Sequence, residues 1–288
     1  SKRFSHVSPL TKKLGVTMKK KLICIIAIVS LLICVLPISA FAAQRNDIII
    51  LYENDVHCEI DGYSVLSAMR NELKQEYEHV GIVTSGDFLQ GGSLGGISRG
   101  EYVVRLMNLV GYDAVTLGNH EFDNGLDTLA AVLKDAQFAV VSANYDVQGT
   151  ALEGIVKPYV ILRRGGMKIG LFGLGVNPQG LVAEKNFAPA KYLEPIPVAQ
   201  EISTLLKEQH HCDLVVCISH MGTFAHGDKP SDTLLAQSTR YIDVIIGGHT
   251  HKIVTNHYVA NLDGDSVLLA QMGKSGARIG KITLKMGE

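Results

Sequence analysis

A short apolar run passes directly into a polar cluster in the segment AVTLGNHEFD, residues 114–123. Residues 114–117 predict a buried β-strand, because they are apolar or β-branched and Gly118 ends the run. The polar residues Asn119, His120 and Asp123 therefore stand at the carboxyl end of a strand. In open α/β sheets, this is the place where ligand-binding loops gather.

The same succession of an apolar run and polar residues recurs at four other places. Strands are predicted over residues 47–52, 81–84, 214–219 and 244–247. Because such strand ends meet along one edge of a sheet, five loops can bring their side chains into a single cleft. The candidate site residues that follow these five strands are Asp55, His57, Asp87, Asn119, His120, Asp123, His220, His249 and His251.

Amphipathic segments separate the predicted strands and complete a βαβ rhythm. Residues 159–174 predict a hairpin that turns at Gly165 and Gly166, where glycine tolerates a positive φ. No repeat or long linker interrupts the pattern, so we predict one α/β catalytic domain over residues 43–288. The other predicted elements are helices over residues 63–77, 101–109, 126–135, 197–209 and 232–239, a strand over 138–142, and two strands within 266–286 joined at 273–276.

Two carboxylates, one amide and four imidazoles form a mixed ligand set without thiolate. This set suits Mn, Zn or Fe and suits Ca alone poorly. A carboxylate such as Asp87 can bridge two ions, so we predict two divalent metal ions. Each motif alone has a structural explanation, because Asp and Asn cap helices and Gly-Asp pairs form turns. Their joint occurrence favours a metal site with the ligands Asp55, His57, Asp87, Asn119, His220, His249 and His251.

The N-terminal region has the pattern of a secretory signal peptide over residues 18–42. Met18 and three lysines precede an apolar run over 22–36, and Ala40 and Ala42 fit a cleavage site. We therefore predict a secreted or extracytoplasmic protein without a stable membrane span, the alternative being a retained anchor. Residues 1–17 precede this start and are interpreted as an upstream artefact.

Charge and cysteine content narrow the possible roles. With 27 Lys and Arg against 28 Asp and Glu, the chain has no electrostatic footprint for a nucleic-acid scaffold role. Cys58, Cys212 and Cys217 form no disulfide framework, and we expect buried or inert thiols with one disulfide possible. Among the remaining histidines, His226 is the one whose glycine-flanked loop could face the cleft.

The motifs together resemble those of the calcineurin-like metallophosphoesterases, and more narrowly the bacterial 5′-nucleotidase and UDP-sugar hydrolase branch. The resemblance covers nearly all of the chain after the signal. The segment FLQG at residues 88–91 lacks the Asp-Arg pair of the protein phosphatase branch. The motifs concerned are NDVH at 54–57, GD at 86–87, MNLVGYDA at 107–114, GNHEFD at 118–123, SH at 219–220 and GHTH at 248–251.

This resemblance implies a four-layer sandwich of two mixed β-sheets flanked by helices. In the resembled nucleotidases a C-terminal nucleotide-binding domain follows; we expect it to be absent here, which would leave the site more open, the alternative being that the chain is a fragment of a two-domain protein. Cys58 stands where many relatives have glycine, which implies an oxidisable thiol beside a ligand, and some relatives have glutamine in place of His251. The implied ligands are Asp55, His57, Asp87 and His251 for one metal, and Asp87, Asn119, His220 and His249 for the other.

The function that we expect is hydrolysis of a nucleotide phosphate ester by in-line attack of a metal-bound hydroxide. Asn119 and His120 would contact the substrate, and His120 would donate a proton while Asp123 fixes its tautomer. The alternative role for Asp123 is a helix N-cap. Two other functions stay open: a cyclic-nucleotide or other phosphodiesterase, and a noncatalytic metal-binding surface protein.

Overall fold

The computed structural model describes residues 45–224 and 229–285. These residues form two six-stranded mixed sheets and a two-stranded one. The predicted signal peptide, the upstream segment 1–17 and His226 lie outside the described residues. No helix in the described ranges has both the length and the apolar character needed to cross a membrane.

The first sheet has the strand order β14-β1-β2-β3-β4-β6. Its strands are parallel except for β14, which pairs antiparallel with β1 at one edge. Their carboxyl ends therefore point to one side of the domain. The bounds are β1 (Arg45–Glu53), β2 (Tyr77–Thr84), β3 (Ala114–Thr116), β4 (Ala139–Val141), β6 (Val156–Lys157) and β14 (Gly280–Leu284).

The second sheet has the order β12-β13-β11-β10-β8-β7. The four inner strands are parallel, and β7 and β12 are antiparallel edges. The bounds are β7 (Tyr159–Arg164), β8 (Met167–Gly175), β10 (Leu214–His220), β11 (Val244–Ile246), β12 (Ile253–Ala260) and β13 (Ser266–Met272), and the two-stranded sheet comprises β5 (Tyr145–Asp146) and β9 (Lys191–Tyr192).

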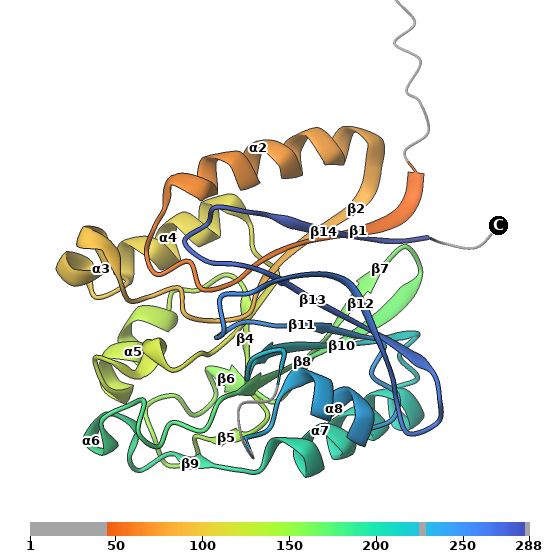
Figure 1. Ribbon diagram of the computed structural model, residues 1–288. Coiled ribbons are helices and arrows are strands. Elements are labelled where there is room, and N and C mark those ends of the chain that lie inside the picture. The colour runs from red at the N-terminus through yellow and green to blue at the C-terminus, as the bar shows by residue number, and fades with distance from the viewer. Residues whose placement is uncertain (1–44, 225–228, 286–288) are drawn as a thin grey trace, which may run out of the picture. The chain divides into compact units, whose positions relative to one another are not determined.

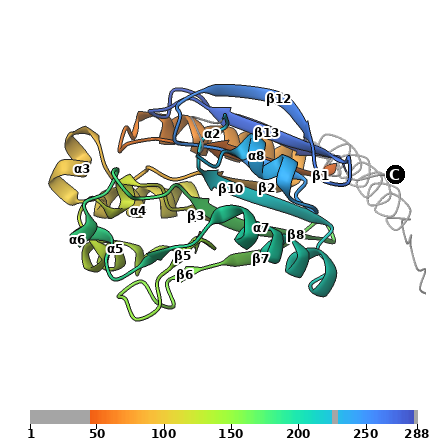
Figure 2. The ribbon, with the colours of Figure 1, turned by 60° about the horizontal axis from the view of Figure 1, so that its bottom comes forward.

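Helices cover the outer faces of both large sheets (Figures 1 and 2). The first sheet carries α2 (Asp61–Glu76), α4 (Glu101–Val110) and α5 (Leu126–Leu133), whereas the second carries α7 (Pro195–Thr204) and α8 (Asp232–Ser238). The prediction of a four-layer α/β sandwich is confirmed. Short helical segments are α3 (Gly92–Ser98), α6 (Glu184–Phe187), the 3-10 turn η1 (His120–Phe122) and the π-helical turn η2 (Leu205–Gln209), which continues α7.

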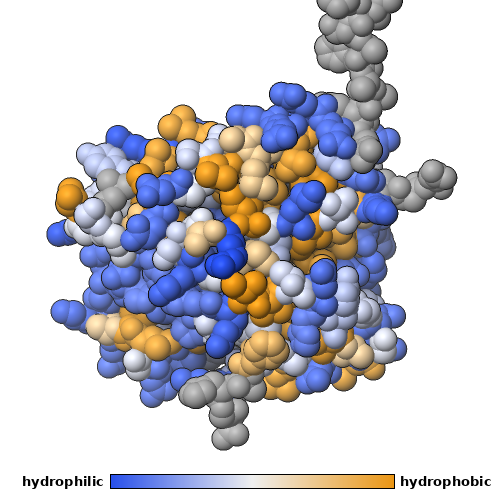
Figure 3. All heavy atoms as spheres, turned by 45° about the horizontal axis from the view of Figure 1, so that its top comes forward, coloured by the Kyte–Doolittle hydropathy of each residue, from blue (hydrophilic) through white to orange (hydrophobic). Residues whose placement is uncertain are grey.

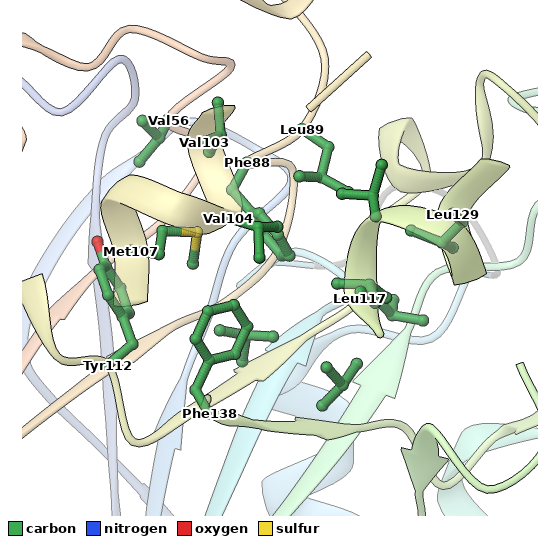
Figure 4. Packing of buried hydrophobic residues seen from close by; sticks show 14 of the residues in the cluster. Val56, Phe88, Leu89, Val103, Val104, Met107, Tyr112, Leu117, Leu129 and Phe138 are labelled. Atoms are coloured by element: carbon green, nitrogen blue, oxygen red, sulfur yellow. The ribbon is translucent and has the colours of Figure 1, made fainter. Parts of the chain in front are cut away.

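The inner strands are buried on both faces, which explains their continuous apolar runs. In β1, Ile49 and Leu51 face the helices, whereas Ile48 and Ile50 face the second sheet. Val103, Val104 and Met107 of α4 gather near Phe88, which is fully buried (Figure 4). The loop after β2 is therefore anchored in the core beside Asp87.

The face of the domain drawn in Figure 3 mixes hydrophilic residues with several separate apolar groups. Single exposed apolar residues are normal on globular proteins. Among the described residues, Ile97 and Leu109 are the most exposed large hydrophobic ones, and they lie on the short α3 and on α4. Neither of them belongs to the strand ends that carry the candidate site.

The predicted elements are confirmed with small shifts of their ends. The helix predicted over 126–135 ends at Leu133, and the hairpin turns at Gly165 and Gly166, which both have a positive φ. The two strands predicted within 266–286 are β13 and β14, which belong to different sheets. The strand β12, whose burial alternates weakly, was not predicted from the sequence, and neither were the short elements α3, α6, β5, β6 and β9.

We predict that Gly173→Ala destabilises the fold by about 1 to 3 kcal/mol, the usual effect of overpacking. Gly173 lies on β8 where the sheets approach so closely that its carbonyl accepts a hydrogen bond of 2.8 Å from the amide of Ala143. A Cβ atom at Gly173 would collide with the carbonyl oxygen of Val141 and the hydroxyl of Thr116. Urea unfolding would measure the loss.

The matched control for this measurement is Gly96→Ala on α3. A Cβ atom at Gly96 would have open space around it, and alanine favours a helix over glycine. This variant should be as stable as the original protein or slightly more stable. Equal stability of the Gly173→Ala and Gly96→Ala variants would contradict the close approach of the sheets.

Candidate metal centre

The structure brings all seven predicted ligands to one edge of the domain. Asp55 and His57 follow β1, Asp87 follows β2 and Asn119 follows β3, whereas His220 ends β10 and His249 and His251 follow β11. The predicted ligands thus come from both large sheets. Potential ligand atoms form three overlapping sets, and within each set the atoms lie within 4.8 Å of one another. The sets are Asp55 with His57 and His251; Asp87 with His220 and His249; and His57 with Asp87 and His120.

The first set contains two imidazole nitrogens that face each other. Nε2 of His57 lies 3.3 Å from Nε2 of His251, and Nε2 of His251 lies 3.2 Å from Oδ1 of Asp55. Asp55 is fully buried, whereas His251 is exposed. Two nitrogen lone pairs and a carboxylate directed at one small space are the donors expected around a divalent cation.

The second set centres on buried His220. Its Nδ1 donates a hydrogen bond of 2.5 Å to the carbonyl oxygen of Ser85, and such a bond fixes the tautomer of a metal-binding histidine. Its Nε2 lies 3.0 Å from Oδ2 of Asp87 and 3.9 Å from Oδ1 of Asp55. The His220 ring therefore adjoins carboxylates of both ligand sets.

Two buried polar atoms in this cluster have no hydrogen-bond partner in the structure: Oδ1 of Asn119 and Nε2 of His220. Although Nε2 of His220 is close to Asp87, the relative orientation of the two groups does not allow a hydrogen bond. Buried polar atoms without partners are rare, because they lose their hydration without compensation. Metal ions would supply the missing partner to both atoms, so these donors fit a divalent metal centre.

The charges of the cluster shift its pKa values in opposite directions. Burial lowers the pKa of His220, but the charges of Asp87 and Asp55 outweigh burial and raise it to about 10. His220 in turn lowers the pKa of Asp87, against the effect of burial. Burial and the charge of His220 lower the pKa of His249 to about 4. A cation would replace the proton on His220, since histidine binds metals in its neutral form.

The backbone is strained at this edge. Five of the seven predicted ligands have a positive φ: Asp55, His57, Asp87, His249 and His251. Residues other than glycine seldom adopt this conformation, and it persists where the surroundings enforce it. The amide of Asp55 donates to the carbonyl of Gly86, and that of His57 to the carbonyl of Asp87, at 3.0 and 2.9 Å. The left-handed turns point the side chains of consecutive residues in directions that a regular strand would not allow.

Gly118 is required by close contact rather than by its φ. A Cβ atom there would collide with Oδ1 of Asp87 and lie 2.7 Å from Nε2 of His220. Any larger residue would push apart two predicted ligands. The glycine that ends the strand in the sequence thus also makes room for the centre.

Sequence reasoning missed the role of Glu121, although it lies within the GNHEFD motif. Its buried carboxylate accepts four backbone hydrogen bonds, from Asp87, Phe88, Leu89 and Gly118, at 2.7 to 3.1 Å. These four amides belong to the loops after β2 and β3. Burial and the charge of Asp87 raise the pKa of Glu121 to about 7. Glu121 clamps together the two loops that carry Asp87 and Asn119.

Asn54 was also missed as a positioning residue. Its amide nitrogen donates to Oδ2 of Asp55 and to the carbonyl of Gly273, each at 2.6 Å. Its amide oxygen accepts a bond of 2.7 Å from the amide of Met272. Asn54 thereby orients the Asp55 carboxylate and ties it to the end of β13, a contact between residues 219 positions apart.

His120 and Asp123 form the pair that the sequence predicts. Nδ1 of His120 lies 2.8 Å from Oδ2 of Asp123. Burial lowers the pKa of His120, but the hydrogen bond to Asp123 and the charge of Asp87 raise it overall. The alternative role of Asp123 as a helix cap is not observed, because Gly125 precedes α5 and no side chain caps that helix. The amide of His120 also donates to Oδ1 of Asp87 at 2.9 Å.

Cys58 differs from the expectation of an oxidisable thiol beside a ligand. The side chain is buried, and its thiol lies 3.4 Å from the carbonyl oxygen of Phe88. Burial raises the pKa of Cys58 to about 12, so the reactive thiolate form is suppressed. The prediction of buried thiols is confirmed for Cys58, Cys212 and Cys217, which are all free, whereas their low reactivity stays a prediction.

The two-sheet sandwich and the cluster of carboxylates and histidines at its edge define a domain of the metal-dependent hydrolase type. Residues 49–253 match the family described as calcineurin-like phosphoesterase, and the chain belongs to this family. The resemblance inferred from the motifs is thus confirmed.

Relatives with nucleotide-related names share this domain. A snake venom 5′-nucleotidase of Gloydius brevicauda is 30% identical over 235 residues, which are 73% of this chain and 38% of the relative. The trifunctional nucleotide phosphoesterase YfkN of Bacillus subtilis is 27% identical over 277 residues, 84% of this chain and 18% of the relative. The chain thus spans well under half the length of these curated relatives.

A solved structure shows the same fold. The 5′-nucleotidase precursor from Thermus thermophilus has a TM-score of 0.75 and 26% identity, and the similarity covers 84% of this chain and 52% of that one. NAD nucleotidase of Haemophilus influenzae has a TM-score of 0.72 at 24% identity, covering 83% and 47%. The sheets and helices described above are therefore the fold of this family.

We predict that Glu121→Gln lowers the free energy of unfolding by about 2 to 6 kcal/mol. One end of the amide cannot accept hydrogen bonds, so two of the four buried backbone N–H groups lose their acceptor, and each such loss costs about 1 to 3 kcal/mol. Thermal and urea unfolding would measure the change. The matched control is Glu153→Gln, since exposed Glu153 accepts one backbone bond, from Gly149. A similar loss of unfolding free energy in both variants would contradict the role of Glu121 in holding the two loops together.

Proposed function

We propose that this protein hydrolyses nucleotide phosphate esters, as a 5′-nucleotidase-like enzyme, at a centre of two divalent metal ions. The observation that carries the proposal is the contact between His120 and Asp123. The ring of His120 adjoins the predicted metal ligands, since it shares one set of ligand atoms with His57 and Asp87. A bare metal-binding site has no need of a histidine held in one orientation by a carboxylate. The names of several relatives, 5′-nucleotidase among them, support a nucleotide substrate.

In this proposal each metal has its own ligand set and both share Asp87. Asp55, His57, Asp87 and His251 would hold one ion, and Asp87, Asn119, His220 and His249 the other. The first and second sets of adjacent ligand atoms support this division, and the unpartnered Oδ1 of Asn119 supports its place in the second. Mn, Zn and Fe suit these nitrogen and oxygen donors.

The bound metal pair would supply an activated water and offset negative charge on the phosphoryl oxygens. The side chains around the metal pair would bind the substrate and donate the proton. His120 is held by Asp123 through Nδ1, which leaves Nε2 free to donate a proton to the leaving oxygen. The hydrogen bond to Asp123 and the charge of Asp87 raise the pKa of His120 against the effect of burial, which favours the protonated form that a general acid needs. Asn119 and His120 would contact the substrate phosphoryl group.

We propose that the enzyme acts outside the cytoplasm. The support is the sequence pattern of residues 18–42, with its lysines, apolar run and small residues. The mature catalytic domain would start at residue 43. N-terminal sequencing of the exported protein should return Ala43, and an uncleaved N-terminus would contradict this part of the proposal.

Substrate assays combined with metal analysis would test the proposed activity. Purified protein loaded with Mn or Zn should bind about two ions per chain, as in two-metal hydrolases, and release phosphate from 5′-AMP or UMP from UDP-glucose. Faster hydrolysis of 2′,3′-cyclic AMP or bis-nitrophenyl phosphate would favour a phosphodiesterase instead. Two bound ions without turnover of any of these esters would favour a noncatalytic metal-binding protein.

We predict that His120→Asn lowers kcat by about 100-fold or more, the scale of losing a general acid, while the metal content stays constant. Asp123→Asn should lower kcat less, because the His120 ring keeps its place but loses the carboxylate that orients it. Steady-state kinetics and elemental analysis on the same samples would measure both quantities. Unchanged turnover in the His120→Asn variant would remove its proposed role.

A further inference from the structure

A cleft of about 760 Å³ opens beside the metal centre on the side of the second sheet. It begins at His249, one of the predicted ligands, and extends away from the cluster. Its volume lies in the range of pockets that hold small organic ligands. Its lining includes Asn177, Gln179, Tyr192, Phe224, His249 and Thr250.

Two aromatic side chains line the cleft. Phe224 is 51% exposed, although a phenyl ring gains free energy by burial. Its ring meets His257 edge-on at a centroid distance of 5.7 Å, so one side is supported and the rest is open. Tyr192 is half-buried in β9, where its ring lies 6.4 Å from that of Tyr145. The cleft therefore offers aromatic surface that the described residues leave uncovered.

Polar groups at the rim complement these aromatic side chains. Asn177 and Gln179 lie on the loop after β8. Oδ1 of Asn177 accepts a hydrogen bond of 3.0 Å from the amide of Gln179, which fixes the side chain and leaves its NH₂ group directed elsewhere. Amide side chains carry both donors and acceptors, which match the edge of a nucleobase.

We propose that this cleft binds the nucleoside part of the substrate. A nucleobase combines a flat aromatic face with a hydrogen-bonding edge, and stacking on aromatic side chains accepts any base. Because the cleft starts at His249, a nucleoside inside it lies next to phosphate held at the metal centre. The inference rests on the proposed nucleotide hydrolysis and adds that the catalytic domain itself supplies a base-binding surface.

Kinetics of Phe224→Ala on two substrates would test the cleft. 5′-AMP reaches into the cleft, whereas glycerol phosphate has no aromatic group. We expect the ratio of KM for 5′-AMP to KM for glycerol phosphate to rise about 5-fold or more, the effect of losing one base–aromatic stack. Phe224→Tyr should restore the ratio. The matched control is Tyr258→Ala, since Tyr258 is an exposed aromatic residue of β12 outside this cleft.

A binding measurement separates this proposal from the proposed hydrolysis. Titration calorimetry with adenosine, which carries no phosphate, should show weaker binding to Phe224→Ala than to the unaltered protein and to Tyr258→Ala. An unchanged KM ratio together with unchanged adenosine binding would overturn the proposal. If the unaltered protein hydrolyses no phosphate ester but Phe224→Ala still weakens adenosine binding, the proposed hydrolysis fails and the nucleoside cleft stands.

Discussion

The candidate centre depends on one buried carboxylate, that of Glu121, which is not among the predicted metal ligands. Glu121 receives four backbone amides from two loops that belong to different strands, so it fixes where Asp87 and Asn119 lie relative to each other. Phe88, buried in the core, holds the same loop from the opposite direction. Burial of Glu121 and the negative charge of Asp87 raise the pKa of Glu121, and a cation at the centre would offset that charge. The loops are thus built for a positive charge at their meeting point.

The distance between the two sheets also determines the geometry of the candidate centre. The parallel strands of both sheets end at the same edge, and the site residues of the first sheet meet those of the second there. Gly173 lets the sheets touch through their backbones, and Gly118 lets the ligands of β2 and β10 approach. Asn54 links β1 to the end of β13. Small side chains and backbone-directed amides therefore determine the spacing of the cluster as much as the ligands do.

The sequence was sufficient to predict the longer buried strands, most helices and the residues at the strand ends, because buried parallel strands leave clear apolar runs. It could not reveal the positive φ of Asp55, His57, Asp87, His249 and His251, since this conformation is imposed by contacts between loops. The role of Glu121 was hidden because its partners are backbone amides, which leave no pattern in the side chains. The burial of the Cys58 thiol, which raises its pKa, could not be predicted from its neighbours in the sequence. The edge strand β12 was missed because most of its residues are exposed.

Because the predicted ligands come from strands of both sheets, a metal pair bound at this edge would connect the two sheets. Sliding of one sheet over the other by even a fraction of an ångström would spread the coordinating atoms apart. Any mutation that loosens the contact between the sheets, however distant from the edge, should therefore show up first as leaching of metal, well before the domain melts.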